Sequence, residues 1–170
     1  KRILCSKCFD NGTVCASEQS IIVEQAMEAQ VLAQAQRMGY YLMDDEQARR
    51  LASLLFIGGG LNPKVVGKTA AELAKRAGFT DPCGTKVLMA REKQAGADHP
   101  YSREKLCPVL ALFVEPNEDA VLDRVIEVLT FEGGGHTFCM HCEDQAVVKK
   151  FALQVPVSRF IVNAPAALGG

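Results

Sequence analysis

The sequence has neither an excess of basic residues nor a long apolar run. Its 19 lysines and arginines are balanced by 20 aspartates and glutamates, and the formal net charge is -1 at pH 7. Because binding to a phosphate backbone depends on clustered positive charge, nucleic acid is not expected as a partner. No stretch reaches the ~20 apolar residues that cross a bilayer, and no signal pattern opens the chain at Lys1. We therefore expect a cytoplasmic protein without a membrane partner.

The chain also lacks the even cysteine count of a secreted disulfide framework. It has seven cysteines, an odd number in a chain of 170 residues that is long enough for a core of its own. Reduced thiols in the cytosol are therefore predicted. The cysteines are Cys5, Cys8, Cys15, Cys83, Cys107, Cys139 and Cys142.

Neither standard glycine-rich phosphate loop is present. The stretches "IGGGLNP" (57–63) and "EGGGHTFC" (132–139) match neither GxGxxG nor the Walker A pattern. The first glycine run is typical of a turn or a close approach of backbones. In the second, His136 follows three glycines at an expected loop-to-strand transition, where an imidazole would project into a cleft. The alternative is a structural histidine whose ring nitrogens form hydrogen bonds with neighbouring residues.

Short apolar runs alternate with segments of helical periodicity. Capping-box patterns at Asp44 with Gln47 and at Thr69 with Glu72 mark the starts of two helices. Strands separated by helices predict βαβ crossovers, hence one α/β domain of three layers with a mainly parallel sheet. The polar stretch 92–103 is expected on the surface. The expected strands are 20–23, 86–90, 109–114, 136–141 and 159–163, and the other helical segments are 27–38, 121–129 and 144–154.

Cys15 lies in "NGTVCASEQS" (11–20), between a turn sequence and a β-branched run. Its small neighbours would let a substrate reach the sulfur, and Ser17 or Glu18 could orient the loop. A thiol reacts as the thiolate, which nearby backbone amides favour. Spacing alone leaves the alternative of an inert core cysteine open.

Two CxxC pairs, Cys5 with Cys8 and Cys139 with Cys142, have the sequence form of a four-cysteine zinc site. A noncatalytic α/β module stabilised by zinc is therefore one alternative function. The pairs lie much farther apart than the ~15 to 20 residues typical of such sites. The second pair also falls in an expected strand, where alternate side chains point to opposite faces. No metal ligands are therefore assigned.

Glu104, in "SREKLCPVL" (102–110), precedes an expected strand and lies four residues before Pro108. A solvated surface carboxylate is the default interpretation. A carboxylate at a strand edge can also accept hydrogen bonds from the hydroxyls of a dinucleotide's ribose.

Taken in order, several segments resemble the CoA-acylating aldehyde dehydrogenases, the acetaldehyde and propionaldehyde type within the aldehyde dehydrogenase superfamily. The resemblance covers essentially the whole chain, and the cysteine segment with the later GHT belongs to the acylating branch. The segments are "FDNGTVCASEQSIIV" (9–23), "LNPKVVGKTAAELAKRAG" (61–78), "YSREKLCPVLALF" (101–113), "GGGHT" (133–137) and "VPVSRFIVNAPAALGG" (155–170).

The resemblance implies a role for three residues. Cys15 would be the catalytic nucleophile, Glu104 would contact the nicotinamide ribose of NAD, and His136 would lie near the active site and assist coenzyme A. The implied fold is that of the family's catalytic domain, spanning residues 1–170. A nucleotide-binding domain and a C-terminal oligomerisation segment would lie outside these residues, and the isolated chain would be inactive.

The implied activity is reversible oxidation of a short-chain aldehyde to acyl-CoA through a cysteine thioester, with NAD and coenzyme A as partners. The parent enzyme would be a homo-oligomer, and a bacterial microcompartment is an alternative location to the free cytoplasm. A fragment of a hydrolytic aldehyde dehydrogenase is the remaining alternative, which would need a general-base glutamate ahead of Lys1. The sequence does not identify the aldehyde.

Overall fold

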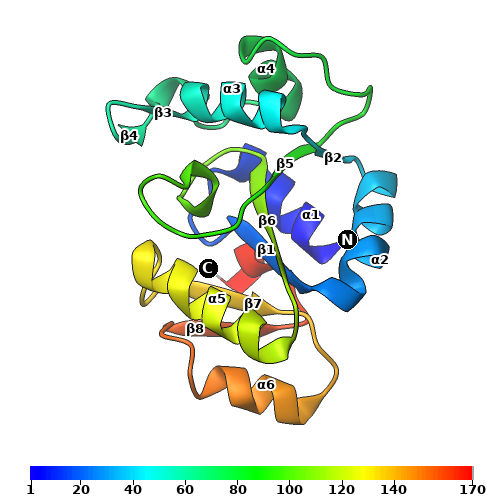
Figure 1. Cartoon of the computed structure of the whole chain (residues 1–170), viewed down its shortest axis with the longest axis vertical. Helices are drawn as coiled ribbons and strands as arrows, with labels where there is room; N and C mark the ends of the chain where they lie inside the picture. The colour runs from blue at the N-terminus through cyan, green and yellow to red at the C-terminus, as the bar shows by residue number, and fades with distance from the viewer. Residues whose placement is uncertain (170) are drawn as a thin grey trace.

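The computed structural model describes residues 1–169 and contains a central sheet in which every strand is parallel to its neighbours (Figure 1). Its strands lie in the order β1, β6, β5, β2, so that β6 and β5 are the inner strands. Parallel strands need helical crossovers, which the alternating sequence supplies. The bounds are β1 Ser20–Glu24, β2 Tyr40–Leu42, β5 Val87–Arg91 and β6 Val109–Glu115.

Two smaller strand pairs complete the architecture. β7 (Thr137–Met140) pairs in parallel with β8 (Arg159–Val162), while β3 (Phe56–Ile57) and β4 (Gly60–Leu61) form a small antiparallel hairpin. In Figure 1, β7 and β8 lie beyond β1, between the main sheet and helix α6. The α/β class and the mainly parallel pairing expected from the sequence are confirmed.

Helices cover both faces of the main sheet, as the alternating side chains of β5 demonstrate. Val87 and Met89 pack with Ala35 of α2 and with the start of α1, whereas Leu88 and Ala90 pack under α3 and α4. Since alternate residues of a strand face opposite sides, the apolar run 87–90 must be buried on both faces of the sheet. The helices are α1 Arg2–Cys8, α2 Gln25–Arg37, α3 Asp45–Leu55, α4 Ala70–Arg76, α5 Glu118–Phe131 and α6 Gln145–Ala152.

The two predicted capping boxes are present. The Asp44 side chain accepts the Gln47 N–H at the start of α3, and the Thr69 hydroxyl accepts the Glu72 N–H at the start of α4. Each satisfies backbone donors that a helix start leaves unpaired. No helix among residues 1–169 is both long enough and apolar enough to cross a membrane.

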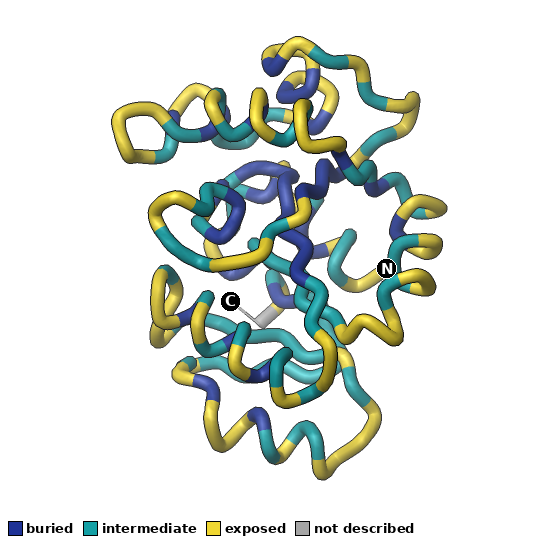
Figure 2. The backbone as a smooth tube through the Cα atoms, viewed as in Figure 1, coloured by how far each residue is buried: buried dark blue, intermediate teal, exposed yellow. Residues whose placement is uncertain are grey.

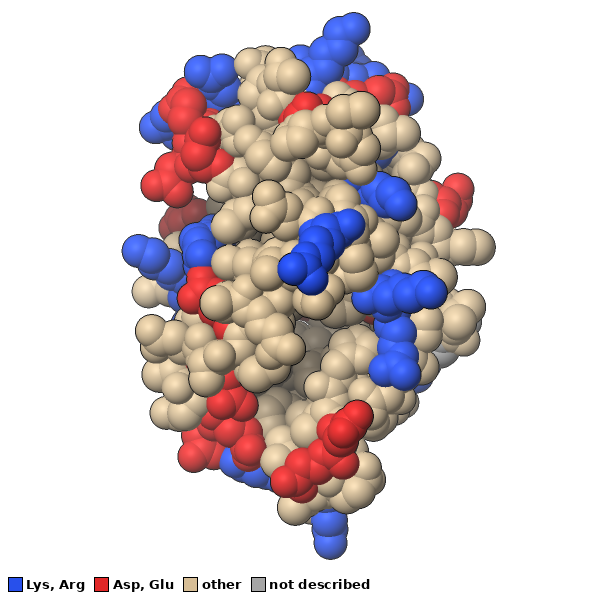
Figure 3. Space-filling model, turned by 90° about the vertical axis from the view of Figure 1, so that its right-hand side faces the viewer, with Lys and Arg blue, Asp and Glu red and all other residues tan. Residues whose placement is uncertain are grey.

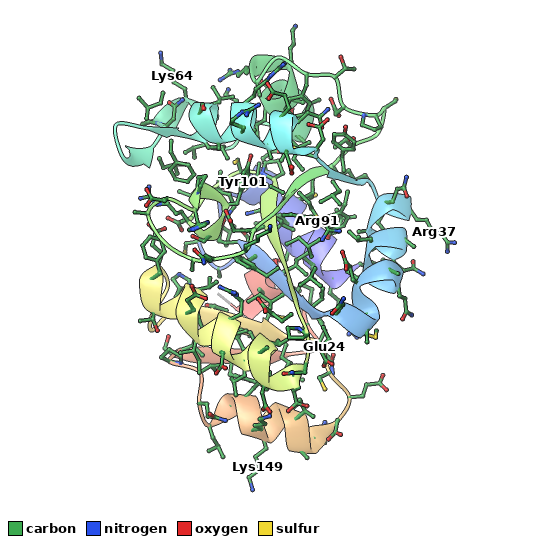
Figure 4. The ribbon with its side chains drawn as sticks, viewed as in Figure 1. Glu24, Arg37, Lys64, Arg91, Tyr101 and Lys149 are labelled. Atoms are coloured by element: carbon green, nitrogen blue, oxygen red, sulfur yellow. The ribbon has the colours of Figure 1, made fainter. Side chains whose placement is uncertain are left out.

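The stretch 92–103, expected on the surface, turns inward at its end. Tyr101 and Ser102 lie in a short 3-10 helix (Pro100–Ser102) and are only 4% and 2% exposed. The Tyr101 hydroxyl donates to the Ala48 carbonyl of α3, so the ring fills the space beneath that helix (Figure 4). That expectation was wrong for these residues because an apolar ring with a bonded hydroxyl gains from burial.

Burial falls off from the main sheet toward β7. The first four residues of β5 and most of β6 are buried, whereas the residues of β1, β7 and β8 are half-buried or, at Glu24, exposed (Figure 2). β1 and β7 are apolar at most positions, as expected for strands of a covered parallel sheet. Their partial exposure follows from a cleft that separates them.

Candidate active site

The three residues singled out in the sequence line one cleft of about 870 Å³. Cys15 and Glu104 are exposed and His136 is half-buried. The wall at this end of the cleft also includes Ser17, Glu18 and Glu132. Figure 3 shows the molecular surface hollowed at the height of β7. Segments more than 100 residues apart in the sequence therefore meet at one accessible site.

Each of the three residues precedes a strand. Cys15 comes shortly before β1, Glu104 before β6, and His136 immediately before β7. The site therefore lies at the amino ends of these strands. Open parallel sheets usually bind ligands at the carboxyl ends, so a rule based on topology alone would have placed the site at the opposite edge.

An unusual backbone turn presents Cys15. Asp10, Asn11 and Gly12 follow α1 with φ values of 46°, 50° and 76°, all in the left-handed region. Aspartate and asparagine tolerate this region better than most residues, and glycine does so without strain. A Cβ at Gly12 would lie 2.9 Å from the Cys107 carbonyl carbon and oxygen, so only glycine allows this approach.

Gln19 ties the Cys15 loop to the Glu104 segment. Its Oε1 accepts the backbone N–H of Lys105 at 3.1 Å and the Lys7 Nζ at 3.3 Å. One amide oxygen thus joins α1, the Cys15 loop and the residue after Glu104. Gln19 was not predicted as part of the site, because nothing in its local sequence signals a contact 86 residues away.

Glu132 provides a second tie, between Glu104 and the loop that carries His136. Its Oε2 accepts the Glu104 N–H and its Oε1 accepts Arg103 Nε, both at 2.9 Å. Charge-assisted hydrogen bonds of this kind are stronger than neutral ones. Glu132 comes just before the glycines that precede His136, and it was also missed from the sequence. The Glu104 carboxylate has no hydrogen-bond partner among the residues described.

The imidazole of His136 contacts a neighbour that is itself held in place. His136 Nδ1 lies 3.0 Å from Thr137 Oγ1, which also accepts Arg159 Nε at 3.0 Å. A hydroxyl oxygen has two lone pairs and can accept from both nitrogens. In the tautomer whose Nδ1–H donates to this oxygen, the lone pair of the neutral imidazole is on Nε2.

Two lysines are fully buried behind the site. Lys105 Nζ donates to the carbonyls of Tyr101 (2.7 Å) and Arg103 (2.6 Å), and Lys7 Nζ donates to Gln19. Burial lowers the pKa of Lys105 to about 7 and that of Lys7 to about 8. The shift toward the neutral amine arises because the low-dielectric interior disfavours the charged form.

The cysteines do not form a metal centre in the part of the chain that the structure describes. No group of three or more histidine, cysteine, aspartate or glutamate side chains converges there in a way that could hold an ion. The Cys139 thiol donates instead to the Ala164 carbonyl at 3.0 Å, and Cys142 lies beyond the end of β7. The observed geometry gives the zinc-module alternative no support.

Comparison with curated proteins finds relatives over the whole chain, although no family model matches it. An aldehyde-alcohol dehydrogenase of Streptococcus pneumoniae is 34% identical over 177 residues, covering 99% of this chain and 20% of the relative. An acetylating succinate-semialdehyde dehydrogenase of Clostridium kluyveri is 35% identical, covering 99% and 37%. The chain thus spans about a fifth to two fifths of the relatives it matches. These homologues confirm the resemblance to acylating aldehyde dehydrogenases.

Solved structures agree with this fold. An acetylating aldehyde dehydrogenase from Geobacillus thermoglucosidasius superposes with a TM-score of 0.96 at 36% identity, covering 99% of this chain and 37% of that one. A propionaldehyde dehydrogenase from Rhodopseudomonas palustris, solved with bound CoA and an acylated cysteine, has a TM-score of 0.87 at 26% identity and covers 99% and 38%. An engineered glycolyl-CoA reductase with bound NADP+ gives 0.88 at 26% identity, with the same coverage.

Proposed function

We propose that this chain, homologous throughout to one segment of the acylating aldehyde dehydrogenases, supplies the nucleophile side of an enzyme that converts a short-chain aldehyde and coenzyme A into acyl-CoA. The observation that carries the proposal is the meeting of Cys15, Glu104 and His136 at one cleft. The bound CoA and acylated cysteine of the Rhodopseudomonas relative support the same chemistry here. The cofactor is a nicotinamide dinucleotide, which we take to be NAD.

Cys15 is the proposed nucleophile. Its thiolate adds to the aldehyde carbonyl carbon, and the carbonyl electron pair moves onto oxygen. The backbone N–H of Cys15 makes no hydrogen bond to another backbone group among the described residues and is available to that oxyanion. Loss of hydride from the same carbon re-forms the carbonyl and leaves a thioester on Cys15.

His136 is proposed to act on the incoming thiol. With Nδ1–H donating to Thr137 Oγ1, the Nε2 lone pair takes the proton from the coenzyme A sulfur. That sulfur attacks the thioester carbonyl, and the Cys15 thiolate leaves. The hydrogen bond from Arg159 holds the Thr137 oxygen, and so orients the imidazole.

Glu104 fits a nicotinamide dinucleotide because its carboxylate is exposed at the cleft and has no partner among residues 1–169. Such a carboxylate can accept hydrogen bonds from two ribose hydroxyls. When bound, the dinucleotide accepts the hydride. The hydrogen bond from the Glu104 N–H to Glu132 fixes the backbone from which the carboxylate extends.

The decisive experiment uses the complete polypeptide that the gene encodes, assayed for coenzyme A-dependent NADH formation with acetaldehyde, propionaldehyde and succinate semialdehyde. We expect Cys15→Ala to abolish the activity, and we expect mass spectrometry to find the acyl group on Cys15 when coenzyme A is omitted. Cys83→Ala, at an exposed cysteine outside the cleft, is the matched control and retains activity. A Cys15→Ala enzyme of normal activity contradicts the assignment.

Two further variants separate the remaining roles. Glu104→Gln is expected to raise the KM for NAD more than that for coenzyme A. His136→Asn is expected to slow acyl transfer to coenzyme A while leaving acylation of Cys15 intact. NADH formation that does not require coenzyme A, with a free acid as product, favours the hydrolytic alternative instead.

A further inference from the structure

Glu104 itself makes a single hydrogen bond within residues 1–169. Its N–H donates to Glu132 Oε2 at 2.9 Å, whereas its carbonyl and its carboxylate have no partner there. Glu104 is also exposed and belongs to no helix or strand, so no regular backbone pairing holds it. A side chain that binds a ligand has to be held to within about 0.5 Å of the productive position. The position of Glu104 therefore depends on what holds Glu132.

The Glu132 carboxylate is held by the residue next to Glu104. Arg103 Nε donates to Glu132 Oε1 at 2.9 Å, so two neighbouring residues bind the two oxygens of one carboxylate. The Arg103 and Glu132 side chains are only 20% and 32% exposed. Hydrogen bonds between ionised groups are the stronger class, and partial burial reduces their screening by salt. The guanidinium thus fixes the carboxylate that receives the Glu104 N–H.

Arg103 is anchored in turn to the β3–β4 hairpin. Its Nη1 donates to the Gly59 carbonyl at 2.9 Å, and its guanidinium lies 4.8 Å from the centre of the Phe56 ring. Phe56 follows directly after Leu55, a fully buried residue at the end of α3. A guanidinium bound to a carboxylate, a carbonyl and a ring face has little freedom to turn. Arg103 therefore connects Glu104, through Glu132, to a part of the chain that is fixed to the core.

His136 has supports of its own, which do not involve this arginine. The Arg159 N–H donates to the His136 carbonyl at 3.2 Å, and both backbone groups of Gly135 bond to the segment that leads into β8. Three glycines separate His136 from Glu132. Because glycine turns freely about its backbone bonds, a shift of Glu132 need not move the imidazole. Loss of the Arg103 contacts is thus expected to move Glu104 and to leave His136 in place.

We propose that Arg103 is a positioning residue for the dinucleotide site and that it acts through Glu132, holding Glu104 in register with the β3–β4 hairpin. Arg103 touches neither the dinucleotide nor the reacting atoms. Without the guanidinium, the Glu132 carboxylate is left partly buried without its cation, so it turns toward water and releases the Glu104 N–H. Arg103 thereby adds to the proposed function, and its role rests on the one proposed there for Glu104.

The test uses the complete polypeptide that the gene encodes. We expect Arg103→Ala to raise the KM for NAD roughly tenfold, since a small displacement of a binding group is costly. The rate at which coenzyme A removes the acyl group from Cys15, measured in a single turnover of the preformed acyl enzyme, is expected to stay unchanged. Arg103→Lys keeps the charge but cannot bond to both Glu132 and Gly59, so an intermediate KM is expected. If Arg103→Ala does not fold, Arg103→Lys provides the measurement.

Arg124→Ala is the matched control. Arg124 Nε bonds to Glu115 at 2.7 Å, its guanidinium lies 5.4 Å from the centre of the Phe113 ring, and its side chain is 17% exposed. Arg124 and Glu115 thus repeat the chemistry of the other pair, but neither residue lines the cleft. Any loss of stability is expected in both variants, whereas the rise in the KM for NAD is expected in the Arg103 variants alone.

A double variant separates positioning from a general loosening of the fold. Because Arg103 acts through Glu104, Arg103→Ala in a Glu104→Gln background is expected to raise the KM for NAD by less than about twofold. For the same reason, Arg103→Ala combined with Glu132→Ala is expected to have the KM of Glu132→Ala alone. An arginine that only stabilises the fold would raise the KM by the same factor in every background.

Three outcomes overturn the role of Arg103. They are a normal KM for NAD in the folded Arg103 variants, a rise that persists undiminished in the Glu104→Gln background, and an equal rise in Arg124→Ala. Failure of the proposed function gives a different result. A normal KM for NAD in Glu104→Gln overturns the role of Glu104 and that of Arg103 with it, whereas a raised KM in Glu104→Gln beside a normal KM in Arg103→Ala overturns the role of Arg103 alone.

Discussion

The backbone N–H of Ala166 donates to Glu18 Oε1 at 3.3 Å, joining the end of the chain to the loop that carries Cys15. Close by, Ser6 Oγ of α1 accepts the Ala167 N–H at 2.9 Å. The carboxyl group of Glu18 thereby connects the Cys15 loop to the short helix Ala166–Gly169.

Glu18→Gln is expected to flatten the dependence of stability on pH. Burial raises the pKa of Glu18, outweighing its hydrogen bonds and the nearby Lys7, so the folded state favours the protonated acid. As the pH rises from the ordinary carboxyl value through the raised one, folding therefore becomes less favourable. Glutamine keeps an acceptor for Ala166 and has no proton to lose. Urea unfolding from pH 4 to pH 8 measures the slope.

Glu18→Ala provides the control, since it removes both the titration and the acceptor. We expect it to lower the free energy of unfolding at every pH, by about 1 kcal/mol or more, because the Ala166 N–H loses its partner. An unchanged pH slope in Glu18→Gln would show that folding does not raise the pKa of Glu18.

Lys105 is expected to make the protein more stable as the pH rises from 7 to 9. Burial lowers its pKa to about 7, so the unfolded chain binds more protons than the folded state in this range. The free energy of unfolding therefore increases as the pH rises. The gain is on the order of 1 to 2 kcal/mol. Lys105→Met is expected to remove this gain, measured by urea unfolding at both pH values.

Lys64→Met is the matched control, because Lys64 is exposed and its side chain makes no ion pair within the described residues (Figure 4). It is expected to leave the pH dependence intact. The comparison stops at pH 9 because burial raises the pKa of Cys107 to about 11, and ionisation of that thiol works in the opposite direction above pH 9. Equal slopes in the two variants would contradict the assignment to Lys105.

The sequence predicted most strands and both capping boxes, because short apolar runs and side-chain caps are local signals. It missed α1, whose sequence RILCSKC is short and mixed, and β2, which has only three residues, YYL. The meeting of Cys15 with Glu104 depends on Gln19 and Gly12, whose partners are distant in the sequence. Such contacts follow from tertiary packing, so the residue types at the site could be predicted and the ties between them could not.

Five of the seven thiols are expected to fall into a slow and a fast group in their reaction with an alkylating reagent. Burial raises the pKa of both Cys107 and Cys139 to about 11, whereas Cys5, Cys15 and Cys83 are exposed. Since the thiolate is the reactive form, Cys107 and Cys139 should be modified by iodoacetamide at pH 8 roughly 100-fold more slowly than the exposed group. Peptide mass spectrometry at timed intervals measures each site. Equally fast modification of Cys107 and Cys15 would contradict the burial of Cys107.

Gly12→Ala is expected to destabilise the protein and to displace the Cys15 loop. An alanine there combines a left-handed φ of 76° with a Cβ at 2.9 Å from the Cys107 backbone, which cannot move aside as a flexible side chain would. The cost is on the order of 2 to 4 kcal/mol, since steric overlap adds to the conformational strain. Thermal and urea unfolding measure the loss.

Gly84→Ala measures the backbone strain without the steric overlap, because Gly84 has a similar φ of 87° and nothing lies within 4 Å of the added Cβ. It is expected to cost only about 1 kcal/mol. The difference between the two variants therefore measures the contact between Gly12 and Cys107. If that contact positions the nucleophile loop, Gly12→Ala also changes the rate at which Cys15 reacts with iodoacetamide, while Gly84→Ala leaves that rate unchanged. Equal losses of stability in the two variants would mean that the loop does not depend on the Cys107 backbone for its position.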